Sequence, residues 1–358
     1  MAEIWNKYDP TAARSHPKPG RTNRPKSLTF DMHAHVGIPA AGQFVGSHFD
    51  PMTTPLVRWQ SPETRAVNAK QEEDLKTRIT PAGFDQRLRD LDAMGLDQQL
   101  ILPPPPQCYY TVPIDIAVKA AQIVNDGIAE FVARAPDRYI GMGTVPMPDG
   151  KEAAKELERS MKQHGFKGAQ VLTNVGGKEL SDPAFAPFWA KAEELGALIV
   201  IHPNGFTQGE RFAKYYFNNV IGNPLDTTMA LHYLIFDGVL ERHPNLKIFA
   251  VHGGGYLGGY SGRIDHAWGA RADAHAGLPK PPTHYLKKNV YFDTVVFTEH
   301  QLEYLIKVFG ADHIIMGTDY PFDMADYDPL AHLAATPGLD ASALAAIAGG
   351  NAKRLLGL

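Results

Sequence analysis

The sequence predicts an α/β protein built as a (β/α)8 TIM barrel. Three observations carry this prediction: eight short apolar runs, helical patterns between them, and polar residues that follow several of the runs. Continuous apolar runs that alternate with helices are typical of a parallel sheet covered on both faces. Eight such strands favour a closed barrel over an open doubly wound sheet, and no glycine-rich dinucleotide-binding turn follows the first run.

The expected strands are the apolar runs Leu28–Met32, Gln99–Leu102, Tyr139–Val145, Gly168–Leu172, Ala197–Ile201, Lys247–Val251, Val290–Phe292 and His313–Met316. Helical spacing of apolar residues is found over Phe84–Met94, Ile114–Arg134, Gly150–His164, Pro183–Leu195 and Leu225–Arg242. In such a barrel all strand C-termini meet at one rim, where barrel enzymes carry their catalytic residues.

We expect a single domain over residues 1–358 with two additions to the barrel. Residues 1–26 are polar and rich in Pro, Arg and Lys, which predicts an extended arm. Residues 37–80 follow the first strand and are rich in proline and polar side chains. A segment this long between a strand and a helix predicts an insertion that acts as a lid.

Composition and charge exclude several classes of protein. Lysine and arginine total 35 against 39 aspartate and glutamate, so the net charge is −4 and there is no basic surface for nucleic acid or anionic membranes. A lone cysteine, Cys108, excludes an intramolecular disulfide framework and a cysteine-based zinc site. No apolar run approaches the roughly 18–20 residues that span a bilayer, and no secretory signal is present. We therefore expect a cytoplasmic protein.

The strongest functional signal is an H-x-H pair, His33 and His35, at the end of the first expected strand. Side chains alternate along a strand, so both imidazoles should point to one side, opposite Met32 and Ala34, and suit one metal ion. Taken alone, the pair could equally be two solvated loop residues.

Three further polar residues follow apolar runs: His202, His252 and Asp319. Any one of them could be an ordinary hydrogen-bonded structural residue, because buried polar groups usually are. Five such residues at the ends of strands one, five, six and eight are better explained by a shared metal site at the barrel rim. The remaining histidines fall on expected helices or loops.

This order of residues resembles the amidohydrolase superfamily of metal-dependent barrels, and within it the α-amino-β-carboxymuconate-ε-semialdehyde decarboxylase group. The resemblance runs over nearly the whole chain from residue 28 onward. Its most specific parts are His252-Gly-Gly-Gly and Gly317-Thr-Asp-Tyr-Pro-Phe322. The other matching stretches are Thr144-Val-Pro-Met, His202-Pro, Ala213-Lys-Tyr, Gly238-Val-Leu-Glu-Arg-His-Pro-Asn-Leu-Lys, Gly262-Arg263-Ile264 and Gly350-Asn-Ala-Lys-Arg-Leu-Leu-Gly.

The resemblance implies that four residues hold one divalent ion: His33, His35, His202 and Asp319. Such a set leaves a position open for water or substrate. Nitrogen-rich ligation suits zinc, with manganese as the alternative. The fourth expected strand ends Gln170-Val-Leu-Thr and has no lysine that could bridge two ions, so we expect a mononuclear site.

The resemblance also implies the remaining roles. His252 would stay unligated and act as the acid–base group, because an imidazole titrates near neutral pH. Asp319 would shuttle a proton to the carbon that loses CO2. Arg78 and Arg263 match positions that bind the substrate carboxylate, although either could instead be a surface residue. The counterpart of Arg263 reaches in from a second subunit, which implies a homodimer.

Two departures from the resembled group lie near the expected pocket. The stretch Lys214-Tyr-Tyr-Phe-Asn-Asn219 replaces a run with two tryptophans, so Tyr216 takes the place of the aromatic side chain that lines the pocket. Phe297 stands where a histidine is found. We therefore expect a substrate other than the muconate semialdehyde, and a phenolic or heteroaromatic carboxylate fits equally well.

We predict an enzyme, a metal-dependent carboxy-lyase that decarboxylates an unsaturated or aromatic (phenolic or muconate-type) carboxylic acid without oxidation. The alternative is hydrolysis or hydration of a small carboxylated ring or ring-cleavage product by the same metal-activated water. A catalytically silent metal-binding barrel is disfavoured, because the expected ligands, the base and Arg263 are all present.

Overall fold

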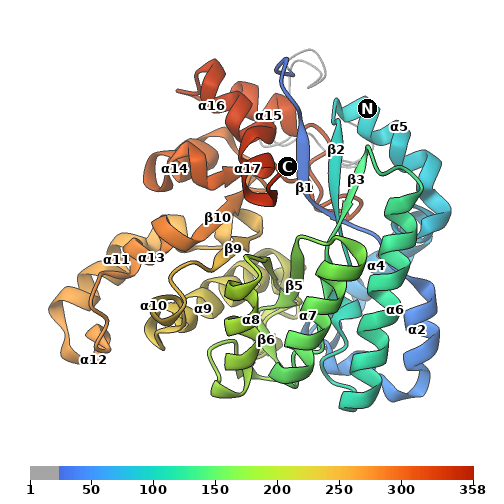
Figure 1. Ribbon diagram of the computed structural model, residues 1–358, viewed down its shortest axis with the longest axis horizontal. Helices are drawn as coiled ribbons and strands as arrows, with labels where there is room; N and C mark the ends of the chain where they lie inside the picture. Colours follow the sequence, from blue (N-terminus) through green and yellow to red (C-terminus); the bar gives the residue numbers. More distant parts are fainter. Residues whose placement is uncertain (1–23) are drawn as a thin grey trace.

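A computed structural model describes residues 24–358, apart from the side chains of residues 72–74. Parallel strands form its centre and helices surround them (Figure 1). The strands are β1 (Phe30–His35), β2 (Gln98–Leu102), β3 (Tyr139–Gly141), β4 (Gly143–Thr144), β5 (Gly168–Leu172), β6 (Asn174–Val175), β7 (Lys178–Glu179), β8 (Leu198–His202), β9 (Lys247–Ala250), β10 (Val290–Asp293) and β11 (Ile314–Ile315).

Two hydrogen-bonded seams close these strands into a barrel. β3 pairs with β2 and β4 pairs with β5, so one strand interrupted at Met142 joins the sheet β1–β2–β3 to the sheet β4–β5–β8–β9–β10–β11. At the other seam, Met32 N donates to Met316 O at 2.9 Å and His35 N donates to Tyr320 O at 2.8 Å. The predicted eight-stranded barrel is therefore confirmed, and β6 and β7 form a separate antiparallel hairpin.

The helices are α2 (Pro39–Val45), α3 (Pro55–Arg58), α4 (Pro62–Ile79), α5 (Phe84–Met94), α6 (Ile114–Ala133), α7 (Gly150–His164), α8 (Ala186–Glu194), α9 (Asn223–Phe236), α10 (Val239–Arg242), α11 (Leu257–Ala270), α12 (Ala272–His275), α13 (Pro282–Asn289), α14 (Glu299–Phe309), α15 (Pro329–Ala335), α16 (Ala341–Ala345) and α17 (Asn351–Leu356). The predicted ranges of α5 and α7 agree with these bounds. The single helix predicted over 225–242 is wrong, because Gly238 at φ +73° separates α9 from α10. Within the described residues, no helix is long and apolar enough to cross a membrane.

Two apolar clusters lie on the two sides of the barrel wall. Along β8, Leu198 and Val200 belong to the inner cluster, whereas Ile199 and Ile201 pack outward against helices. The inner cluster also includes Leu355 from α17. Because α17 packs into the barrel interior at the N-terminal ends of the strands, the opposite rim is left for the functional site.

The side-chain alternation of β1 changes within the strand. Its pairing with β2 has a register shift between Asp31 and Ala34. Phe30 and Met32 consequently belong to the inner cluster, whereas Ala34 belongs to the outer one. Uninterrupted alternation would place all three on one face, so the expectation that Met32 and Ala34 lie together opposite the histidines is wrong.

The predicted arm lies outside the described residues except for 24–26, where Arg24 forms an ion pair with Asp97 at 2.7 Å. The segment over residues 37–80 is largely helical, with α2, α3 and α4. It is fastened to the loop after β8, because Leu56 N donates to Asn204 O at 3.1 Å. The segment therefore borders the rim of the barrel, and its movement as a lid stays a prediction.

Candidate metal centre

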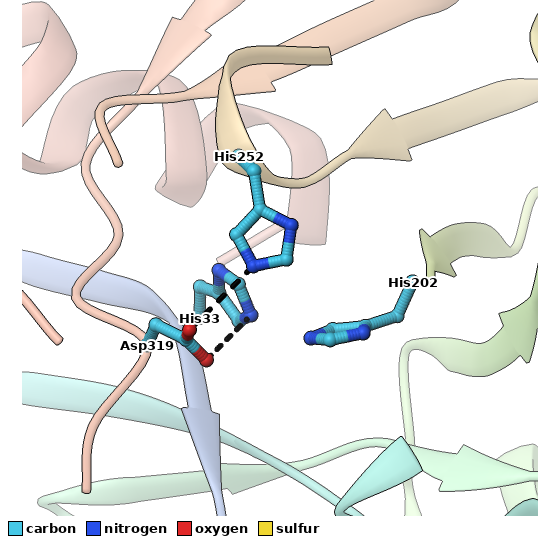
Figure 2. Close-up of side chains that lie close together, drawn as sticks. All are labelled: His33, His202, His252 and Asp319. Carbon is cyan, nitrogen blue, oxygen red and sulfur yellow. Dashed lines mark ion pairs between the residues drawn. The ribbon is translucent and has the colours of Figure 1, made fainter. Parts of the chain in front are cut away.

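Five predicted side chains meet at the C-terminal rim of the barrel. His33 and His35 end β1, His202 ends β8, and His252 and Asp319 follow β9 and β11. Figure 2 shows four of them, His33, His202, His252 and Asp319, directed toward one point from separate elements. His33 and His35 are fully buried, and His202 and Asp319 are each 5% exposed. The barrel thus brings together residues that are up to 286 positions apart in the chain.

Asp319 is central to this arrangement. Its Oδ1 lies 3.3 Å from His33 Nε2 and 3.2 Å from His35 Nε2. Its Oδ2 lies 3.5 Å from His252 Nε2. One ligand atom from each of His33, His202, His252 and Asp319 lies within 4.8 Å of the others, which is the spacing of a metal site.

The atoms that face this centre lack hydrogen-bond partners. Among the described residues, Nε2 of His33, His35 and His202 and Oδ1 of Asp319 are buried and make no hydrogen bond. Each buried polar atom left unsatisfied costs about 1–3 kcal/mol. A divalent cation accepts lone pairs from three imidazole nitrogens and one carboxylate oxygen, so the four donors fit a mononuclear metal site.

The second ring nitrogen distinguishes three of the histidines from the fourth. Nδ1 is held by an acceptor in three cases: Asp293 Oδ2 for His33 at 2.8 Å, Pro103 O for His35 at 3.0 Å and Pro203 O for His202 at 2.7 Å. Metal-ligating histidines are oriented by such bonds, which leave Nε2 with its lone pair toward the ion. Nδ1 of His252 has no partner in the described part of the chain. The distances alone admit His252 as a ligand, but the orienting bonds favour His33, His35 and His202.

Burial and local charge favour the metal-binding forms of Asp319, His35 and His202, but not that of His33. Burial would raise the pKa of Asp319, but the imidazoles of His33, His252 and His35 hold it well below its usual range. Burial lowers the pKa of His35, and burial with the neighbouring imidazoles lowers the pKa of His202 far below its usual value. Burial also opposes a charge on His33, but Asp319 and Asp293 outweigh it and raise that pKa.

Asp293 is a buried residue beside this centre that the sequence patterns did not single out. It is fully buried at the end of β10, and its Oδ1 accepts a hydrogen bond from Gly253 N at 2.7 Å. Through its two oxygens it therefore connects His33 with the turn that carries His252. The pattern that identified His202 also applies to Asp293, because Asp293 directly follows the apolar run Val290–Phe292.

Asp31 performs a similar task for the loop that carries Asp319. Thr318 donates to Asp31 through its amide at 3.0 Å and through Oγ1 at 2.6 Å, and Gln99 Nε2 donates at 2.7 Å. Burial raises the pKa of Asp31 to about 6 in spite of these bonds. The three bonds hold β1, β2 and the loop after β11 in one arrangement.

Four residues at the site have a left-handed backbone: Tyr216, His252, Phe297 and Asp319, with φ between 55° and 65°. This conformation costs a non-glycine residue on the order of 1–3 kcal/mol and clusters at functional sites. Surrounding bonds hold it in place, since Asp319 N donates to His33 O at 2.7 Å and Gly255 N donates to His252 O at 3.1 Å.

A cavity of about 430 Å³ opens above the centre. His202, His252 and Asp319 form part of its wall, and apolar side chains such as Leu56, Val295 and Phe322 form much of the rest. Asn204 lines it with a buried Oδ1 that has no partner among the described residues. Ligand pockets are usually about 300–1,000 Å³ and mostly apolar with a few polar groups, so this cavity suits one small organic molecule.

The three predicted substrate-binding residues have different positions. Tyr216 lines the cavity, and burial raises the pKa of its phenol well above the usual range, so the phenol stays a hydrogen-bond donor. Arg78 is not in the cavity wall, and its Nη1 donates to Tyr327 Oη at 3.4 Å. Arg263 is exposed on α11, which projects away from the barrel at the left of Figure 1. Among the described residues, no lysine or arginine lines the cavity.

A family model for amidohydrolases matches residues 30–358. The chain belongs to this amidohydrolase family. The match begins at the first residue of β1 and runs through every barrel strand, so it includes all five residues of the centre.

Relatives of this amidohydrolase include several decarboxylases. The 2-amino-3-carboxymuconate-6-semialdehyde decarboxylase of Dictyostelium discoideum is 34% identical over 275 residues, which are 76% of each chain. The gamma-resorcylate decarboxylase of Rhizobium radiobacter is 28% identical over 68% of this chain and 78% of its own. A crystal structure of 5-carboxyvanillate decarboxylase from Novosphingobium aromaticivorans, complexed with manganese and 4-hydroxy-3-methoxy-5-nitrobenzoic acid, matches with a TM-score of 0.81 and 25% identity over 93% of this chain and 97% of that one.

Proposed function

We propose that this amidohydrolase is a metal-dependent, non-oxidative decarboxylase of aromatic or muconate-type carboxylic acids. The observation that carries the proposal is a set of four buried donor atoms without hydrogen-bond partners, on His33, His35, His202 and Asp319. Two of these residues, His202 and Asp319, line a mainly apolar cavity. A cavity of this kind accepts a planar ring, and a divalent ion held by the four donors would supply a Lewis acid beside it. The decarboxylase relatives agree with this assignment.

His33, His35, His202 and Asp319 hold one divalent ion in this proposal. When bound, the ion acts as a Lewis acid that polarises and orients oxygen groups of the substrate. Zinc suits the three imidazoles, and the manganese in the Novosphingobium relative makes Mn²⁺ the alternative. Asp293, Pro103 and Pro203 fix the three imidazole rings through Nδ1, so the site is organised before the ion arrives.

His252 and Asp319 move the proton that the reaction needs. Decarboxylation breaks the bond between the carboxyl carbon and its neighbour, releases CO2 and places a proton on that neighbouring carbon. His252 Nε2 takes up a proton from solvent through the cavity and passes it to Asp319 Oδ2, which lies 3.5 Å away. Asp319 then delivers this proton to the carbon that loses CO2. His252 is partly exposed, which gives it the access to solvent that the buried His33 and His35 lack.

No lysine or arginine among residues 24–358 lines the cavity, so a cationic side chain for the substrate carboxylate has to come from elsewhere. Arg263 on the projecting α11 supplies it to the partner subunit of a homodimer, where a guanidinium can bind a carboxylate through two parallel hydrogen bonds. The partner subunit would also cover the open rim and exclude water, which strengthens the interaction of charged groups. Arg78 assists from the end of α4 if its bond to Tyr327 breaks.

The experiment that tests this function is CO2 release from a panel of phenolic and muconate-type acids by enzyme loaded with Zn²⁺ or Mn²⁺. We expect at least one acid to release CO2 and leave a product one carboxyl group smaller, and we expect a chelator to stop the reaction. A product that keeps its carboxyl group and gains water would instead assign the protein as a hydratase or hydrolase.

A further inference from the structure

Asp323 is a carboxylate in the cavity wall that the metal centre does not use. It lies four residues after Asp319, and its neighbours Phe322 and Met324 also line the cavity. Asp319 is engaged by the imidazoles, whereas no ion pair involves Asp323 among the described residues. Since no described lysine or arginine lines this cavity, the carboxylate of Asp323 faces it without a cationic side chain in the same wall.

Tyr216 is the side chain that contacts Asp323. Its Oη donates to Asp323 Oδ1 over 3.5 Å, whereas hydroxyl-to-oxygen bonds are usually about 2.7–2.8 Å. Tyr216 is fixed in its left-handed conformation, because Asn219 N and Val220 N donate to its carbonyl oxygen at 2.9 and 3.1 Å. An ionised carboxylate accepts about four hydrogen bonds, so Asp323 keeps acceptor sites for a ligand.

Tyr216 and Asp323 also separate two cavities. Both line the cavity above the metal centre, and both line a neighbouring cavity of about 510 Å³ that Glu63 of α4 and Lys214 border. A ring acid bound at the metal centre can therefore extend to this dividing wall. Its substituents on the side opposite the ion would then contact the carboxylate of Asp323 and the phenol of Tyr216.

We propose that Asp323 determines substrate specificity by accepting a hydrogen bond from a ring hydroxyl or amino group and by repelling a second carboxylate. The proposal rests on the proposed decarboxylase function and narrows its substrate to monocarboxylic acids that carry such a donor. A donor group pairs with the charged acceptor in a strong, charge-assisted bond. A second carboxylate would place two like charges at one wall, and discrimination through such repulsion is a common device in specific sites.

The test measures binding of two unreactive probes to the Mn²⁺-loaded enzyme by calorimetric titration. The probe 2-nitroresorcinol has two ring hydroxyls and no carboxylate, and 4-hydroxy-3-methoxy-5-nitrobenzoate has one carboxylate, in the meta position to its nitro group. We expect the wild type to bind 2-nitroresorcinol more tightly. Asp323→Asn should weaken that binding and strengthen binding of the benzoate, so that the ratio of the two Kd values shifts by about tenfold.

Glu63→Gln is the matched control, because Glu63 borders the outer cavity and does not line the cavity above the metal. It removes a negative charge nearby and should leave the ratio unchanged. An unchanged ratio in Asp323→Asn, an equal shift in Glu63→Gln, or no binding of either probe to the wild type would overturn the proposal. The titration needs no turnover, so a wild type that releases no CO2 contradicts the decarboxylase function and does not affect this result.

Discussion

Asp293 and His33 form a fully buried pair in which Nδ1 of the imidazole lies 2.8 Å from Oδ2 of the carboxylate. The other oxygen of Asp293 accepts the Gly253 amide, next to His252. One carboxylate therefore orients both a metal ligand and the turn that carries the proposed acid–base group. Sequence spacing does not predict the bond between Asp293 and His33, since the two residues lie 260 positions apart.

Replacing Asp293 with Asn should weaken metal binding without unfolding the protein. The amide keeps the size of the carboxylate but loses its charge, and removal of such a supporting group typically lowers metal affinity about 10–100-fold. Competition with a chelator measures the change. Asp149→Asn alters the N-cap residue of α7, which belongs to neither the centre nor the wall of its cavity, and should leave metal affinity unchanged.

Alanine at His33, His35 or His202 should abolish stoichiometric metal binding, because each change removes one of the four donors. His252→Ala should keep about one ion per chain, since the orienting bonds place this residue outside the ligand set. Elemental analysis of the four purified variants distinguishes the two groups. Loss of the ion in His252→Ala with retention in His35→Ala would exchange the roles of these residues.

His252→Ala should also reduce the decarboxylation rate by at least about 100-fold, the usual contribution of a positioned acid–base group. The comparison requires enzyme with a full complement of metal, so that the rate reports proton transfer alone. A rate within a few-fold of the wild type would remove His252 from the proton path and leave Asp319 to act without it.

Mixing Arg263→Ala with His252→Ala should restore activity if Arg263 acts across a dimer interface. In a mixed dimer one site draws His252 from the first chain and Arg263 from the second, so that site regains both groups. Loss of the guanidinium in both sites should cost about 2–4 kcal/mol in transition-state binding. Subunit exchange is verified separately by light scattering of differently tagged chains, and exchange without recovered activity would place Arg263 in its own barrel or outside the site.

We expect the contribution of Asp226 to the free energy of unfolding to decrease as pH rises from 4 to 7. It is 5% exposed and accepts hydrogen bonds from Thr173 Oγ1 and from Asn174 Nδ2, and burial raises its pKa to about 6 from 3.8. A folded-state pKa above the unfolded value means that the folded state binds the proton more tightly. The stability that this group contributes is therefore lost as pH rises from about 4 to about 6, and above pH 6 the full cost of burying the ionised carboxylate is present.

Asp226→Asn removes this penalty and should gain about 2 kcal/mol relative to the wild type at pH 7.5, with little gain at pH 4. Urea unfolding of both proteins at the two pH values measures the difference. An equal loss of stability at both values would show that the carboxylate stabilises the loop after β5 more than its burial costs.

The strands could be predicted from the sequence because each is buried on both faces and therefore reads as a continuous apolar run. The helices after residue 243 were not predicted: α11 contains three glycines within its first six residues, and α12, α13, α15, α16 and α17 have eight residues or fewer. α14 was also missed, although its 11 residues equal the length of the predicted α5. The centre was predicted from polar residues that follow strands, and the same rule extends to Asp293. The position of Asp323 was not predictable, because it depends on the left-handed turn at Asp319. The position of Arg263 depends on the direction in which α11 leaves the barrel.

The most direct test of the metal-dependent decarboxylase function follows the carboxyl carbon of a substrate. The enzyme, loaded with Mn²⁺ or Zn²⁺, is given 2,6-dihydroxybenzoate labelled with ¹³C in its carboxyl group, in D2O, and the reaction is followed by NMR. A metal-dependent decarboxylase transfers all the label to CO2 and bicarbonate and leaves one deuterium on the ring carbon that carried the carboxyl group. Label that stays in the organic product, or label released equally from the chelator-treated enzyme, would contradict the account.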